Sequence, residues 1–320
     1  MPDKAPGCDV SRPGDNAPRV LTALPLAFRL AKWWSLHGPE RGRWRSWELA
    51  ARLAGRGRRF QAQLHYGATA LVDLADPMSR YPVAYGGMPE PSLYRAITRV
   101  LAPGDTFVDV GANFGYYTLL AAGLVGPEGA VHSFEPQPGV ADLLRRSAHL
   151  NDMPQVSVHE LALGDEAGSA TMYLPRHAQS GLGTLRGDAD WMSEHDARTV
   201  QVTVATLDGV ADAIGPGPVR ALKIDAEGYE LPVLRGGLGL LRASRPIVFF
   251  ESGGGDDPDE DRVADLLREL GYEIHRLTAH GPVPLAVGDE LADQQNLCAL
   301  LPEDHGPASD LLAGPGEARP

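Results

Sequence analysis

Residues 107–122 read FVDVGANFGYYTLLAA, and this stretch decides the fold. It begins as an apolar run of the strand type, and YYTLLAA continues with the pattern of a helix. Gly111, Asn113 and Gly115 lie in the turn between the two. Glycine permits a tight turn and lets the backbone approach a ligand closely. The stretch therefore predicts a strand, a ligand-binding turn and a helix in succession.

The same rhythm continues toward the C-terminus. Strand-type runs alternate with helical patterns, and such alternation predicts a parallel, doubly wound sheet with helices on both faces. The expected strands are at 106–110, 130–136, 156–165, 219–228, 246–252, 272–278 and 296–302, and the expected helices after the first are at 139–151, 229–244 and 259–271.

The segments outside this pattern divide the chain further. Residues 1–19 and 304–320 have the composition of disordered tails. Residues 20–98 form an N-terminal extension, in which a helical pattern broken at HGPERG precedes an expected β-hairpin around Gly67. The α/β domain then covers 99–303, and a polar, glycine-rich excursion interrupts it at 166–217.

Charge and cysteine content narrow the class of protein. The chain of 320 residues carries a formal net charge of −13, so it should repel nucleic acid. Two cysteines, Cys8 and Cys298, give no disulfide framework and fit a reducing cytoplasm. No apolar run reaches the roughly 20 residues that span a bilayer. We therefore expect a cytoplasmic protein, and its Arg-rich N-terminal region is a candidate substrate lid or homodimer contact.

One N-terminal segment has two interpretations. Residues 21–34, LTALPLAFRLAKWW, are apolar but contain Arg29 and Lys32, and no signal-peptide cleavage site follows them. The segment is either a helix docked on the main domain or, given Trp33, Trp34 and the cations, a helix that lies on a membrane surface.

Carboxylates surround the predicted glycine turn. Asp109 lies two residues before Gly111, where it would disfavour a pyrophosphate and favour a cationic ligand such as S-adenosylmethionine. The spacing G-x-N-x-G also departs from the dinucleotide fingerprint G-x-G-x-x-G. Glu135, at the tip of the second strand, can accept both hydroxyls of a ribose. Asp165 either accepts from an adenine amino group or simply forms a turn.

A second acidic stretch, LKIDAEGYE at 222–230, ends the fourth parallel strand. Ligands of open α/β sheets bind beyond the carboxyl ends of the strands, so Asp225 should lie at the rim of the cofactor crevice. Strand alternation puts Lys223 and Asp225 on the same side. Glu227 and Glu230 begin the next helix, where negative charge suits its dipole. Glu251 ends the following strand and should face the same space as Asp225.

These motifs bring out a family resemblance. FVDVGANFGYYTLLAA, FEPQP, VATLDG and ALKIDAEGYELPVLRGG, in this order, resemble the FkbM family of S-adenosylmethionine-dependent methyltransferases, and the resemblance covers about Phe60 to Pro302. It implies a class I, Rossmann-like methyltransferase domain with a seven-stranded sheet whose last strand, NLCALLP, is antiparallel. It also implies S-adenosyl-L-methionine as cofactor and O-methylation of a natural product or sugar, as in secondary metabolite biosynthesis.

The residues suggest a mechanism for such a transfer. Asp225 is the expected general base or hydroxyl anchor, and Lys223 would tune it or stabilise a developing alkoxide. Alternatively, Asp225 and Glu251 hold Mg²⁺, which would acidify the hydroxyl. Glu227 and His177 are candidate contacts to the substrate.

Two other functional classes remain open at this point. One is an NAD(P)-dependent Rossmann oxidoreductase, which Glu135 and the strand–helix rhythm would also suit. The other is a non-catalytic module that binds S-adenosylmethionine.

Overall fold

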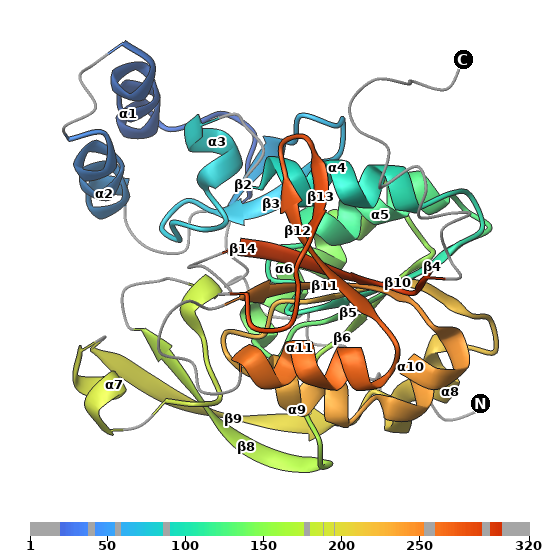
Figure 1. Ribbon diagram of the computed structural model, residues 1–320. Coiled ribbons are helices and arrows are strands. Elements are labelled where there is room, and N and C mark those ends of the chain that lie inside the picture. Colours follow the sequence, from blue (N-terminus) through green and yellow to red (C-terminus); the bar gives the residue numbers. More distant parts are fainter. Residues whose placement is uncertain are drawn as a thin grey trace, which may run out of the picture.

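The fold is known from a computed structural model, which describes residues 20–37, 42–54, 59–85, 90–175, 180–187, 189–194, 196–252, 260–289 and 295–302. Both expected tails lie outside the described residues. Figure 1 shows a central sheet covered by helices, with a helical pair and a small sheet at its periphery. None of the helices in the described ranges has the length and apolar character needed to traverse a bilayer.

The central sheet has the order β13-β12-β14-β11-β10-β4-β5-β6. Its parallel strands are β4 (Thr106–Val110), β5 (Ala130–Phe134), β6 (Val156–His159), β10 (Val219–Ile224) and β11 (Ile247–Ser252). β14 (Gln295–Leu300) is antiparallel to both β11 and β12 (Glu273–Thr278). This confirms the seven-stranded class I methyltransferase sheet. A short eighth strand, β13 (Gly281–Pro284), pairs with β12 at the edge and was not predicted.

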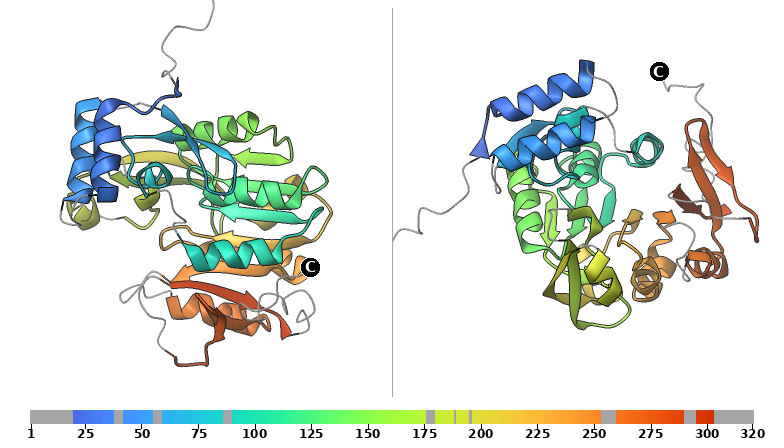
Figure 2. Two further views of the ribbon diagram at one scale, coloured as in Figure 1. Left: turned by 90° about the horizontal axis from the view of Figure 1, so that it is seen from above. Right: turned by 90° about the vertical axis from the view of Figure 1, so that its left-hand side faces the viewer.

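Helices cover both faces of this sheet (Figure 2). Apolar side chains of α4 (Pro91–Val100) and α5 (Tyr116–Val125) share one core cluster with β4 and β11, and α6 (Pro138–Leu150) adds Ala148 to it. The helices α9 (Glu230–Arg235), α10 (Leu238–Ser244) and α11 (Glu260–Glu269), together with the short α8 (Ala211–Ile214), form the second cluster on the opposite face. Leu222 and Ile224 belong to the second cluster, as the alternation along β10 predicts.

The N-terminal extension packs onto this domain. It contains β1 (Val20–Leu21), α1 (Leu26–His37), α2 (Arg43–Ala54), β2 (Arg59–Gln63), β3 (Thr69–Asp73) and α3 (Tyr81–Tyr85). β2 and β3 are antiparallel on either side of Gly67, which has φ +99°, so the hairpin prediction is confirmed. The backbone N–H of Leu71 donates to Ser147 Oγ at 2.8 Å and joins β3 to α6.

The predicted excursion at 166–217 is more regular than its composition indicated. The sequence pattern placed one strand at 156–165, but the structure ends β6 at His159 and begins β7 (Ala162–Leu163) in a separate sheet of order β7-β9-β8. β8 (Gly168–Pro175) and β9 (Ala197–Ala205) pair along their length. Three short helical segments, η1 (Ser180–Leu182), α7 (Ala189–Glu194) and η2 (Asp208–Val210), accompany this sheet.

Candidate active site

The turn between β4 and α5 has the backbone that its glycines predict. Gly111 has φ +71°, and a Cβ built there would collide with the carbonyl oxygen of Asp225. Gly115 caps α5 with φ +91°. Asn113 has φ +49°, in the left-handed region that few residues other than glycine adopt. The turn thus lies directly against the end of β10, because only a missing side chain lets the two segments approach.

A pocket lies at the carboxyl ends of β4 and β10. β4 and β10 are neighbours, yet their chains leave in opposite directions along the sheet order, and this switch point is where open α/β folds bind ligands. The space between its walls is about 680 Å³, including the part that is open to solvent. Its described walls are Met78, Val110, Gly111, Asn113, residues 134–137, 161–163, Met172, Ser180, Gly181, Gly183, Leu185, residues 225–227 and Tyr229.

Glu135 is the buried carboxylate of this pocket and is only 3% exposed. Its Oε2 accepts from the backbone N–H of Asn113 at 3.0 Å, and its Oε1 accepts from that of Gln137 at 2.8 Å. Burial raises the pKa of Glu135 to about 7, against the opposing effect of these hydrogen bonds. Each oxygen keeps a second lone pair, so the carboxylate can still accept the hydroxyls of a ribose.

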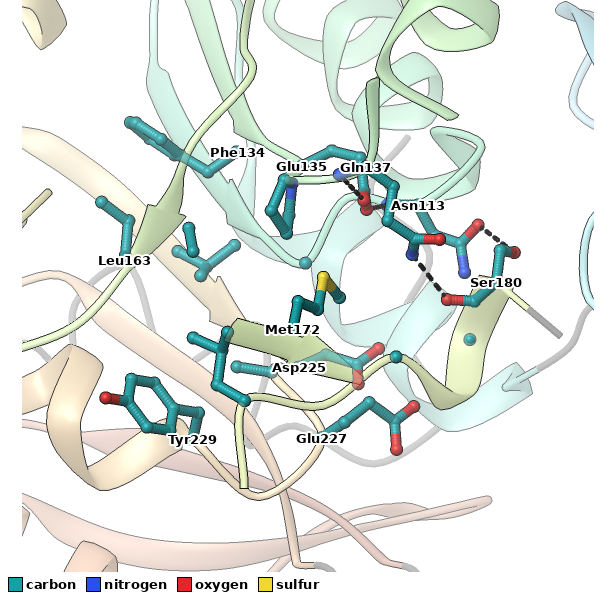
Figure 3. A pocket seen from close by; sticks show the side chains of 18 of the residues that line it. Asn113, Phe134, Glu135, Gln137, Leu163, Met172, Ser180, Asp225, Glu227 and Tyr229 are labelled. Atoms are coloured by element: carbon teal, nitrogen blue, oxygen red, sulfur yellow. Dashed lines mark hydrogen bonds between the residues drawn. The ribbon is translucent and has the colours of Figure 1, made fainter. Parts of the chain in front are cut away.

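The other walls of the pocket fit a ligand that combines an apolar ring with positively charged groups. Phe134 and Leu163 offer apolar surface at one end of the pocket, and the carboxyl groups of Asp225 and Glu227 lie toward the other (Figure 3). The described lining contains three carboxylates and no lysine or arginine. Such a lining suits an ammonium and a sulfonium and disfavours a pyrophosphate, so the residues present fit S-adenosylmethionine.

Asp109 does not line this pocket among the described residues, although the sequence placed it there. It is fully buried, and its Oδ2 accepts from Thr118 Oγ1 at 2.7 Å. Its Oδ1 lies 3.4 Å from Lys223 Nζ, because β4 and β10 put Asp109 and Lys223 opposite each other in register. Lys223 therefore balances the charge of Asp109 inside the protein. A direct contact between Asp109 and the cofactor stays a prediction.

Lys223 is the cation that joins the two acidic motifs. Its ammonium donates to Asp225 Oδ2 at 3.2 Å and also faces Asp109, so it is shared by two carboxylates. Burial alone would lower the pKa of Lys223, but Asp225 and Asp109 together raise it above its ordinary value. Burial raises the pKa of Asp109, and Lys223 and Thr118 oppose that shift. The prediction that Lys223 and Asp225 share one side is confirmed.

Further carboxyl groups surround Asp225, which is about one-third exposed. Partial burial and then Asp225 raise the pKa of Glu227, although its side chain reaches solvent at the pocket mouth. Burial and Asp225 raise the pKa of Glu251 to about 7. Glu230, the first residue of α9, instead holds the loop before its helix, because its Oε1 accepts from the backbone N–H of Ala226 at 2.8 Å and of Gly228 at 3.3 Å. The capping role predicted for it is not what the structure shows. Asp225, Glu227 and Glu251 therefore share one electrostatic environment at the strand ends.

Other predicted site residues are not part of the described lining. Asp165 is exposed and outside the described lining, although its charge influences the nearby Tyr229. His177 lies outside the described residues. The described residues hold no group of three or more His, Cys, Asp or Glu side chains arranged to bind a metal. The Mg²⁺ alternative on Asp225 and Glu251 stays a prediction.

The pocket also contains residues that the sequence did not single out. Gln137 Nε2 donates to the carbonyl of Ser180 at 2.9 Å, and Ser180 Oγ donates to Asn113 Oδ1 at 2.9 Å (Figure 3). These bonds hold the η1 turn over the glycine turn. Gln137 lies two residues after Glu135, and this closeness in the sequence could have identified it as a residue of the site. Met172 and Ser180 carried no such signal.

The raised pKa of Glu135 makes a prediction about stability. Its carboxyl group is protonated more readily in the folded chain, so the contribution of Glu135 to stability is fully present below pH 4.5 and is lost as pH rises through about 7. A shift from 4.5 to about 7 corresponds to about 3 kcal/mol. Glu135→Gln should therefore flatten the decline in unfolding free energy between pH 4.5 and 7. Urea denaturation across that range measures it, and the exposed Glu166→Gln, the matched control, should keep the wild-type slope.

Comparisons with known proteins agree with this geometry. A family model described as the methyltransferase FkbM domain matches residues 109–274, just over half of the chain. The 31-O-demethyl-FK506 methyltransferase FkbM of Streptomyces tacrolimicus is 32% identical over 221 residues, which cover 60% of this chain and 77% of that protein. Methyltransferase 1 of Beauveria bassiana is 30% identical over 151 residues, 42% of this chain and 59% of the relative's length.

Among solved structures, a methyltransferase FkbM from Methylobacillus flagellatus is 17% identical with a TM-score of 0.39; the match covers 66% of this chain and 50% of that one. The family model and the Streptomyces relative carry the assignment. The chain belongs to the FkbM family of S-adenosylmethionine-dependent methyltransferases.

Proposed function

We propose that the chain methylates a hydroxyl group of a small molecule, such as a natural product or a sugar. The observation that carries this proposal is a pocket whose described lining presents Glu135 at one strand tip, Asp225 and Glu227 at another, and no basic side chain. The name of the Streptomyces relative describes methylation of an oxygen on FK506, and this supports an oxygen acceptor here.

Glu135, the glycine turn and the apolar Phe134 and Leu163 would hold the cofactor. When bound, it supplies an electrophilic methyl group on a sulfonium sulfur. The protein then has to orient an acceptor oxygen and take up its proton, because a hydroxyl is a poor nucleophile while it keeps that proton.

Asp225 is positioned for that proton uptake. Its Oδ2 receives Lys223, so Oδ1 is the oxygen left for the acceptor hydroxyl among the hydrogen bonds of the described residues. The ammonium fixes the orientation of the carboxylate, and Glu227 lies beside it at the mouth of the pocket. The hydroxyl proton would pass to Asp225 Oδ1 as the oxygen attacks. Asp165 and His177 remain proposed contacts to the adenine and the substrate, respectively.

Binding and transfer experiments test the proposal in turn. Calorimetry should show binding of S-adenosylhomocysteine and none of NAD⁺ or NADH; the reverse would favour an oxidoreductase. Transfer from methyl-labelled cofactor should then be screened over hydroxylated natural products, sugars, carboxylic acids and amines. A methyl ether survives mild base and a methyl ester does not. Treatment with base therefore distinguishes methylation of a hydroxyl from methylation of a carboxylate. Label only in esters or N-methyl products, or in none at all, would contradict the proposal.

A further inference from the structure

The helical pair α1 and α2 presents an apolar outer face. Six large hydrophobic side chains on these two helices are exposed, among them Leu30 at 60%, Trp33 at 58% and Leu53 at 71%. The other three are Leu26, Trp34 and Leu49. By helical spacing, the four on α1 share one side of that helix and the two on α2 share one side of theirs. A cluster of this kind marks an interaction site, whereas single exposed hydrophobic residues are ordinary. We call these six residues the outer face.

The outer face has no role in holding the helices on the domain. Phe28 and Ala31 of α1 and Trp47 and Ala50 of α2 are buried, and all four belong to the main core cluster. In Figure 1 the two helices lie side by side at one corner of the molecule, and α3 lies between them and the sheet. Each helix therefore has two apolar sides, one of which packs inward while the other is exposed in the part of the chain that the structure describes.

Among the described residues, most of the charges beside the outer face are basic. Arg29, Arg45 and Arg52 are exposed and Lys32 is partly exposed. The acid between them, Glu48, forms an ion pair with the buried Arg80. The chain as a whole carries −13, so this concentration of cations is a local exception.

We propose that the outer face binds an anionic lipid surface. Exposed tryptophan and leucine beside arginine and lysine are what an interfacial helix needs to place apolar side chains among acyl chains and cations among headgroups. A second copy of the chain fits less well. A symmetric contact would bring Arg29, Arg45 and Arg52 of two copies together, and a head-to-tail contact would need a second, complementary surface elsewhere on the chain.

The same helices are connected to the pocket. Glu48 of α2 pairs with Arg80, which follows Met78 in the same turn, and Met78 lines the pocket. Docking of the outer face would therefore fix the orientation of the pocket relative to the lipid. The proposal itself does not depend on which acceptor is methylated.

Vesicle flotation of the full chain tests the proposal. The protein should float with vesicles of phosphatidylglycerol and phosphatidylcholine at low salt, and at least tenfold less with phosphatidylcholine alone or in high salt. Leu30→Glu combined with Trp33→Glu should lower the floating fraction at least tenfold, with an unchanged circular dichroism spectrum. Arg29→Gln combined with Arg52→Gln should weaken binding to the anionic vesicles without altering the apolar surface.

Two matched controls distinguish binding through the outer face from non-specific hydrophobic or electrostatic binding elsewhere on the chain. Val287→Glu changes a side chain that is 81% exposed, and Arg242→Gln removes an exposed cation on α10; both should float like the wild type. The proposal is overturned if the protein floats with neither vesicle type, or equally with both. It is also overturned if light scattering shows that the outer-face variant only converts a dimer into a monomer.

Discussion

Replacing Asp225 with asparagine should lower the rate of methyl transfer by between about 10²- and 10⁴-fold, the contribution typical of a positioned general base. Asparagine keeps the shape of the side chain and a carbonyl oxygen that Lys223 can contact. It has no carboxylate to take up the hydroxyl proton. The measurement is the single-turnover rate with the acceptor found by the screen, at saturating cofactor.

The expected loss is specific to transfer. Affinity for S-adenosylhomocysteine, measured by calorimetry, should stay within about threefold of the wild type, because Glu135 and the glycine turn are unchanged. Asp212→Asn, which alters an exposed aspartate on α8, is the matched control and should leave the rate unaltered. An Asp225→Asn variant with wild-type turnover would remove Asp225 from the mechanism.

Much of the fold could be predicted because its determinants are local. The succession of strand, glycine turn and helix at 106–125 predicted the class of sheet. The acids at the strand tips predicted that Glu135 and Asp225 would lie at one pocket, as they do. The small sheet of β8 and β9 was missed, because polar alternating segments pair only when the chain brings them together. For the same reason, no sequence pattern indicated that Ser180 would contact Asn113, 67 residues away.

The role of Asp109 was the least accessible to sequence reasoning. A carboxylate before a glycine turn suggests a contact with a cation, and the structure supplies one from the protein itself. A signal was nevertheless present. Asp109 is the single charge within residues 106–110, and Lys223 is the single charge within residues 221–224. Adjacent parallel strands in the register observed put the two side by side. Register depends on packing across the whole sheet, so it could not be fixed from either strand alone.

That buried pair gives the second large prediction, which concerns stability. Lys223→Met should lower the free energy of unfolding by about 3–5 kcal/mol, the usual cost of removing one partner from a buried ion pair. Asp109 is fully buried and Lys223 is 3% exposed, so the carboxylate left behind would have Thr118 but no cation. Urea denaturation at pH 7.5 measures the loss.

A double variant distinguishes an uncompensated charge from lost packing. Lys223→Met with Asp109→Asn removes both buried charges and leaves only the part-exposed Asp225 without its cation. It should recover at least half of the stability lost by Lys223→Met alone. Arg242→Met, at an exposed cation of α10, should change stability by less than about 0.5 kcal/mol. If the double variant were no more stable than Lys223→Met, the loss would come from packing around the lysine stem. The ammonium would then not be what holds the glycine turn motif to the end of β10.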